Sequence, residues 1–106
     1  MARFLIRGSY TAEGAKGLLK DGGTGRKKAV ETALQGLGGR LESIYYTFGA
    51  DDVVVICDVP DAVSGLALSL VVNASGAVRI STTPLLTVEE VDSACKKAVN
   101  YRPVGA

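Results

Sequence analysis

The sequence predicts an α+β fold: a four-stranded antiparallel sheet of the ferredoxin-like type, with an extra helix at the C-terminus. Segments that alternate with the two-residue period of strands are separated by segments with helical periodicity, in the order β-α-β-β-α-β-α. Residues 41–86 join a hairpin to a helix and a further strand, with turn residues at each junction. Such an order places the two crossover helices on one face of the sheet.

The first half of the chain contains two strands and a helical segment with an internal break. Residues 3–10 alternate between two faces and predict the first strand. Thr11 can cap a following helix, which two glycines weaken, and residues 20–25 form a flexible break. A stronger helix is expected over residues 26–37, where paired glycines end it. The second strand is expected over residues 41–48.

The second half contains a central strand, a helix and the fourth strand. Residues 53–59 are nearly all apolar, which suits a strand covered on both faces. Asp61 is the expected N-cap of the next helix, and residues 77–85 form the fourth strand. Leu68 and Val72 fall off the expected core stripe of this helix, so they could bind another copy. The expected core stripe consists of Val63, Leu66, Ala67, Leu70 and Val71.

The last helix is predicted by a capping box over residues 87–90 and is expected to end at Arg102–Pro103. Its apolar side is expected to face the body of the protein. That side consists of Val88, Val91, Ala94, Cys95 and Val99.

The sheet face away from the crossover helices is expected to be too apolar to remain in water. The last helix could cover part of this face, and a second copy of the chain could cover the rest. Sheet-to-sheet pairing would give a dimeric α/β barrel, so a homodimer or higher homo-oligomer is expected. The apolar residues expected on this open face are Leu5, Leu41, Tyr45, Val54 and Ile56.

The composition is that of one globular domain over residues 1–106, with a net charge of +1. Scattered basic residues and near-neutrality disfavour a nucleic-acid partner, and no apolar run is long enough to span a membrane. Cys57 and Cys95 form no C-x-x-C pair and are interpreted as reduced core thiols. A cytoplasmic protein without cofactor or metal is therefore expected.

A first candidate site lies on the open face. Strand alternation gives Arg7, Asp58 and Arg79 this face together with Tyr45. Two guanidinium groups near one carboxylate, walled by apolar side chains, would make a pocket for a carboxylate or phenolate ligand. The simpler interpretation is an ion-pair network that pins the dimer, since buried charges need partners. On either interpretation the three charged groups should lie close together.

A second candidate is the glycine-rich segment over residues 22–28, in which Gly25, Arg26 and Lys27 are the candidate anion-binding residues. Cations and free backbone N–H groups at a helix N-terminus could bind phosphate or another anion. The spacing fits neither a P-loop nor a dinucleotide fingerprint, and a solvated loop is the simpler interpretation. The adjacent Asp51 and Asp52 are typical of a turn rather than of a metal site.

Two residues are candidates for proton transfer: Tyr10, which ends the first strand, and Asp58. The chain has no histidine, so the side chain that ordinarily titrates near neutrality is missing. A base would need a strongly shifted pKa. Packing is the simpler role for the tyrosines.

Several segments resemble the GYD domain family of small bacterial and archaeal proteins. They are Tyr10–Gly14, Leu37–Glu42, Tyr45–Gly49, Asp52–Val55, Pro60–Asp61 and Ala74–Arg79. At the turn that resembles the family's Gly-x-Tyr-Asp signature, this chain has Asp51 where a tyrosine is usual. The resemblance implies a ferredoxin-like dimeric α/β barrel and implies no particular activity.

The residues favour a ligand-binding or accessory module over the alternatives. Such a module would hold a small anionic or aromatic molecule between sheet faces, through the open-face residues named above. One alternative is a cofactor-free enzyme of the monooxygenase or isomerase type, working in an apolar cavity. A second alternative is a structural assembly element.

Overall fold

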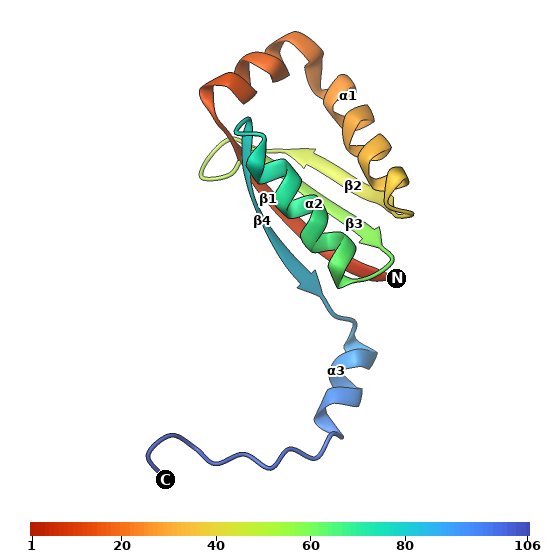
Figure 1. Ribbon diagram of the computed structural model, residues 1–106, viewed down its shortest axis with the longest axis vertical. Coiled ribbons are helices and arrows are strands. Elements are labelled where there is room, and N and C mark those ends of the chain that lie inside the picture. Colours follow the sequence, from red (N-terminus) through yellow and green to blue (C-terminus); the bar gives the residue numbers. More distant parts are fainter.

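The computed structural model describes residues 1–106 and contains four strands and three helices (Figure 1). The expected order β-α-β-β-α-β-α is confirmed. The strands form one antiparallel sheet in the order β2-β3-β1-β4, and α1 and α2 lie over the same face. The elements are β1 (Ala2–Tyr10), α1 (Ala12–Gly36), β2 (Arg40–Tyr46), β3 (Val53–Val59), α2 (Ala62–Ala74), β4 (Val78–Leu85) and α3 (Val88–Cys95).

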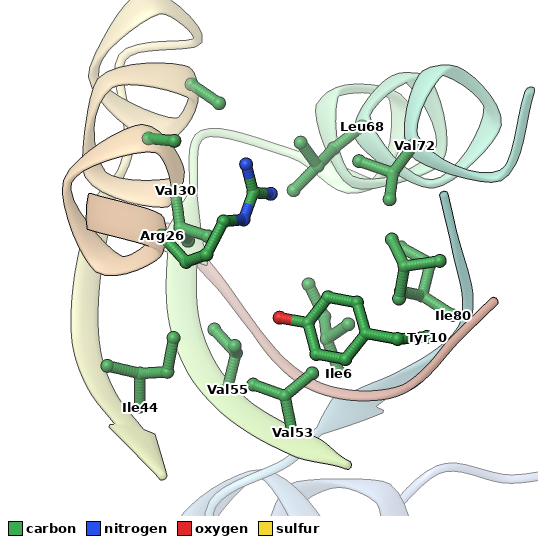
Figure 2. A pocket seen from close by; sticks show the side chains of 13 residues that line it. Ile6, Tyr10, Arg26, Val30, Ile44, Val53, Val55, Leu68, Val72 and Ile80 are labelled. Carbon is green, nitrogen blue, oxygen red and sulfur yellow. The ribbon is translucent and has the colours of Figure 1, made fainter. Parts of the chain in front are cut away.

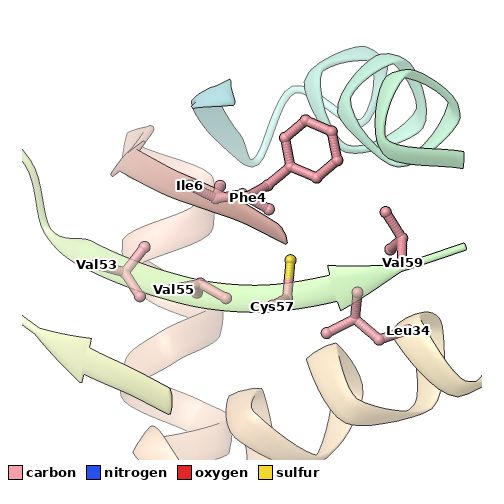
Figure 3. Packing of buried hydrophobic residues seen from close by; sticks show 7 residues of the cluster. All are labelled: Phe4, Ile6, Leu34, Val53, Val55, Cys57 and Val59. Atoms are coloured by element: carbon pink, nitrogen blue, oxygen red, sulfur yellow. The ribbon is translucent and has the colours of Figure 1, made fainter. Parts of the chain in front are cut away.

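The core lies between the central strands and the two helices. Strand alternation turns every second residue of β1 and β3 toward the helices, where α1 contributes one fully buried side chain (Figure 3). Leu34, Val59 and Cys57 are the largest fully buried side chains. The cluster consists of Phe4, Ile6, Leu34, Val53, Val55, Cys57 and Val59.

Helix α1 changes direction at one glycine. Gly22 has φ 73° and ψ 170°, outside helical geometry, within an otherwise continuous helical segment of 25 residues. A positive φ of this size is readily adopted only by glycine. The break expected over residues 20–25 therefore exists, but it is a kink between two helical halves and not a loop.

Helix α2 is rotated relative to the expectation, and the predicted core stripe is wrong. Gly65 lies against the sheet, where a Cβ would approach Cε2 of Phe4 to 2.8 Å. The Ser69 hydroxyl lies 3.1 Å from that of Thr82, a hydrogen bond that holds the helix to β4. Small and polar side chains thus allow the helix to approach the sheet closely. Leu68 and Val72, which lies one turn further along the helix, also face inward.

The opposite side of α2 is consequently exposed to solvent. Leu68 and Val72, expected on the outer surface, instead line a partly open pocket between the helices and the sheet. The assembly surface predicted from these two residues is therefore wrong. The exposed apolar residues of α2 include Val63, Leu66, Leu70 and Val71.

Because of a β-bulge in β2, Leu41 lies on the helix face of the sheet and not on the open face, where it was expected. The pairing of β2 with β3 shifts between Leu41 and Ser43, so that Leu41 lies opposite Cys57 and Ser43 opposite Ile56. The extra residue reverses the alternation on one side of the bulge. Leu41 therefore packs against the core on the helix face, whereas Tyr45 remains on the open face opposite Val54.

Helix α3 does not fold back onto the sheet, so its expected inward face is wrong. The helix ends at Cys95, well before Arg102, and buries none of its residues. It projects from the end of β4 and continues into the C-terminal segment (Figure 1). The Cα radius of gyration is 16.8 Å, against about 13 Å for a compact domain of this length. Cys95 is exposed rather than in a core.

Candidate functional site

A cavity of about 140 Å³ lies between α1, α2 and the helix face of the sheet (Figure 2). Its walls are almost entirely aliphatic, and only Tyr10 and Arg26 bring polar groups to it. Figure 2 shows both side chains directed into the space between the two helices. An engineered apolar cavity of about this size binds benzene, so this one can hold a single aromatic ring. The other lining residues are Ile6, Ala29, Val30, Ala33, Ile44, Val53, Val55, Leu68, Val72, Val78 and Ile80.

The position of Tyr10 is fixed by the end of β1. Its backbone N–H donates to Oδ2 of Asp52 at 2.8 Å, and the Asp52 N–H donates to the Gly8 carbonyl oxygen at 2.7 Å. These two bonds tie the last residue of β1 to the β2–β3 connection. Tyr10 continues the alternation that begins with Phe4 and Ile6, so its ring falls on the helix face.

Arg26 reaches the cavity from the second half of α1, one turn after the kink at Gly22. It forms no ion pair within the chain, since the salt bridges involve other residues. Its side chain also borders a larger outer cleft of about 360 Å³, which contains Glu13 and Asp21. Tyr10 and Arg26 belong to both spaces and therefore stand where the apolar cavity meets the polar cleft.

Tyr46 holds the kinked part of α1 against the sheet. Its hydroxyl donates to the Gly23 carbonyl oxygen at 2.9 Å. Burial raises the pKa of Tyr46 above its usual value, the nearby Tyr10 raises it further, and Arg26 partly opposes the shift. These influences place Tyr46, Tyr10 and Arg26 in one neighbourhood, with the Tyr46 phenol neutral at physiological pH.

Asp58 lies between two arginines that the sequence interpretation did not assign to it. Arg3 donates from Nε to Oδ1 at 3.0 Å, and Arg40 donates from Nε to Oδ2 at 3.1 Å. The hydrogen bond from Arg3 is the main cause of a lowered Asp58 pKa, and the bond from Arg40 lowers it further. A carboxylate held ionised by two guanidinium groups is a poor proton acceptor. The structure therefore gives Asp58 a structural role.

The expectation that Arg7, Asp58 and Arg79 lie close together is wrong. Asp58 is opposite Arg3 on β1, four residues from Arg7, a separation of about 13 Å along the strand. Arg79 is opposite Ser9 on β1. Arg7 and Arg79 are therefore diagonal neighbours, at the end of the open face away from Asp58. Alternation predicted the face correctly, but it could not predict the register between strands.

The candidate anion-binding residues Arg26 and Lys27 do not face a common site either. Gly25, Arg26 and Lys27 belong to the second half of α1 and not to a loop. Arg26 turns into the cavity, whereas Lys27 is exposed and borders a shallow groove against β2. Of the candidate residues, the structure thus brings Tyr10 and Arg26 together.

The sequence interpretation missed the cavity itself and the roles of Tyr46, Arg3 and Arg40. The signal available was the sequence of α2, where Gly65 and Ser69 lie four residues apart, with Leu68 and Val72 beside them. Small residues at helical spacing mark a side that can approach a sheet. No comparable signal pairs Arg26 with Tyr10, because 16 positions separate them.

The structure defines a small α+β domain, with one helical layer over an antiparallel sheet and an apolar cavity between the layers. The chain belongs to the GYD domain family, whose model matches residues 4–95. No curated protein and no solved structure matches the chain. None of its helices combines the length and apolar character needed to cross a membrane.

Proposed function

We propose that this protein is a homo-oligomeric binding module that holds a small aromatic acid in the cavity between α1, α2 and the sheet. The observation that carries the proposal is the unpaired Arg26 at the mouth of a cavity whose other walls, apart from Tyr10, are aliphatic. A guanidinium group at the edge of an apolar pocket favours a carboxylate or phenolate. The ligand site is thus proposed for the helix face, not for the space between two sheets.

The surroundings restrict the ligand's size and charge. The inner cavity accepts about one ring, so the acidic group would lie at the boundary beside Arg26 and Tyr10. Glu13 and Asp21 in the outer cleft repel further negative charge. The proposed ligand class is therefore a monoanionic molecule the size of benzoate.

A second copy of the chain is part of this proposal. The open face carries Leu5, Val54 and Ile56 at its centre, none of them fully buried, with charged and polar groups around them. The chain exposes 7560 Å², whereas a compact protein of its mass exposes about 5,600 Å². Residues 86–106, all of them exposed, contribute to this surplus, which exceeds the roughly 800 Å² that each partner contributes to a standard interface.

Calorimetric titration with benzoate and with benzyl alcohol tests the ligand proposal. Benzoate should bind more tightly, and Arg26→Gln should reduce benzoate affinity about tenfold while leaving benzyl alcohol affinity nearly unchanged. Ala33→Leu should abolish binding of both because it fills the cavity, and Ala67→Leu on the outer side of α2 is the matched control. Equal benzoate affinity in the wild type and the Ala33→Leu variant would refute the site.

An enzyme is the second candidate function, favoured by the position of Tyr10. Its phenol lies in the apolar cavity near an unpaired cation, where a proton donor could act on a bound molecule. Asp58 does not share this role because of its ion pairs. In an enzyme, Tyr10→Phe should remove turnover of a bound acid but retain its binding; in a binding module, the bound molecule is released unchanged.

A further inference from the structure

Residues 86–106 form an arm that leaves the body of the protein with its apolar side chains exposed. Val88, Val91 and Cys95 follow one another at positions i, i+3 and i+7, so they lie along one side of α3. All three are exposed. An isolated helix of eight residues is marginal in water, which indicates that this side needs a partner surface.

The start of the arm is held by a capping box. The Glu90 N–H donates to Oγ1 of Thr87, and the Thr87 N–H donates to Oε1 of Glu90, each at 3.0 Å. These bonds fix where α3 begins, separated by two residues from the end of β4. From there the helix projects away from the chain's own sheet (Figure 1).

The charges of helix α3 and of one end of the open face are complementary, although Lys96, Lys97 and Arg102 balance the acidic residues over the whole arm. Helix α3 carries three acidic residues and no basic one. The open face carries Arg7 and Arg79, which form no salt bridge, whereas Arg3 and Arg40 are paired within the chain. An acidic helix with an apolar side therefore matches an apolar sheet face that has two unpaired arginines at one end.

We infer that the arm of one copy docks on the open sheet face of a second copy, and that the two copies exchange arms. Val88 and Val91 pack over Leu5, Val54 and Ile56, and the acidic flank of α3 faces the unpaired arginines. Reciprocal exchange is a closed two-fold arrangement, in which the same surfaces serve both copies. This inference rests on the proposed homo-oligomer and specifies the segment that covers its open face.

Charge exchange in the full-length chain tests the inference. One variant carries Glu89→Lys with Asp92→Lys, and the other carries Arg7→Glu with Arg79→Glu. All four residues are exposed, so both variants should keep the wild-type circular dichroism spectrum. By light scattering, the wild type should be dimeric, each variant alone should dimerise at least tenfold more weakly, and an equimolar mixture should restore the dimer.

Two controls separate the charge effect from general disturbance. Glu13→Lys with Asp21→Lys makes the same charge change on α1 and should leave the dimer intact. Val91→Lys should weaken the dimer through the apolar side of the arm, whereas Val63→Lys on the exposed side of α2 should not.

The outcomes distinguish the arm from the oligomer. A wild-type monomer would overturn both the proposed oligomer and the arm exchange. A dimer that Glu89→Lys with Asp92→Lys and Val91→Lys do not weaken would overturn the arm exchange alone and support direct pairing of two sheets. Failure of the mixture to restore the dimer would likewise overturn the exchange.

Discussion

The hydroxyl of Tyr46 donates a hydrogen bond to the carbonyl oxygen of Gly23 and thereby joins β2 to α1 just after its kink. The ring also covers Gly23, where a Cβ would lie 3.1 Å from Cε2 of Tyr46. Arg26 begins the next turn and reaches the cavity from there. The contact therefore holds the segment that supplies the cavity's only cation.

Removal of that hydrogen bond should destabilise the protein modestly. We expect Tyr46→Phe to lower the free energy of unfolding by about 0.5–1.5 kcal/mol, the usual net contribution of one hydrogen bond. Tyr45→Phe is the matched control, because Tyr45 lies on the opposite face of the sheet and is 68 % exposed. Urea denaturation measures both; equal loss in the two variants would contradict the role given to Tyr46.

Two glycines of α1 should respond in opposite directions to substitution by alanine. A Cβ on Gly14 would overlap the backbone carbonyl of Ala77, so Gly14→Ala should cost more than about 2 kcal/mol. A Cβ on Gly17 meets nothing within 4 Å, so Gly17→Ala should stabilise the helix by about 0.5–1 kcal/mol. Thermal denaturation gives both values, and similar effects of the two changes would show that α1 is placed differently.

The ion pairs of Asp58 make stability depend on pH. The folded state lowers its pKa below the unfolded value near 3.9, so the unfolded chain takes up the proton first as pH falls. The contribution is complete above about pH 5 and is lost as pH falls through the folded pKa.

Asp58→Asn should therefore cost about 1–2 kcal/mol at pH 7, less than fully buried ion pairs would suggest, because Arg3 is partly exposed and Arg40 is exposed. The difference from the wild type should shrink at pH 3. Urea denaturation at both pH values measures it, and a difference independent of pH would contradict an electrostatic origin.

The buried thiol should be unreactive in the folded protein. Burial raises the pKa of Cys57 to about 11, and the adjacent Asp58 adds to the shift. In a Cys95→Ser variant at pH 8, Ellman's reagent should modify Cys57 only after urea unfolds the chain. Rapid modification without urea would indicate that β3 opens readily or that the thiol is not in the core.

Helix α2 shows how far the sequence could predict the fold. Asp61 was correctly identified as the N-cap, where its side chain accepts from the Ser64 N–H. The buried side of the helix was predicted wrongly. Apolar residues lie on all sides of α2, so periodicity alone selects the side with the largest ones. The deciding contact is that of Gly65 with Phe4, which depends on tertiary packing.

The candidate site was predictable only in part for a related reason. The sequence identifies Tyr10 as a candidate for proton transfer and Arg26 as a candidate for anion binding. The meeting of Tyr10 with Arg26 depends on the direction of α1 after Gly22, which local sequence does not determine. The partners of Asp58 depend on the register between strands. Hydrophobic alternation does not determine this register, because a shift by two residues leaves every side chain on the same face.

Methyl-detected NMR during titration with benzoate tests the proposed ligand site itself, since it reports where the ligand lies. The cavity and the open face carry different methyl groups, so the two locations are distinguishable. Saturable shifts are expected at Val30, Leu68, Val72 and Ile80. Shifts confined to Leu5, Val54 and Ile56, or no saturable shift at millimolar benzoate, would contradict the proposed site.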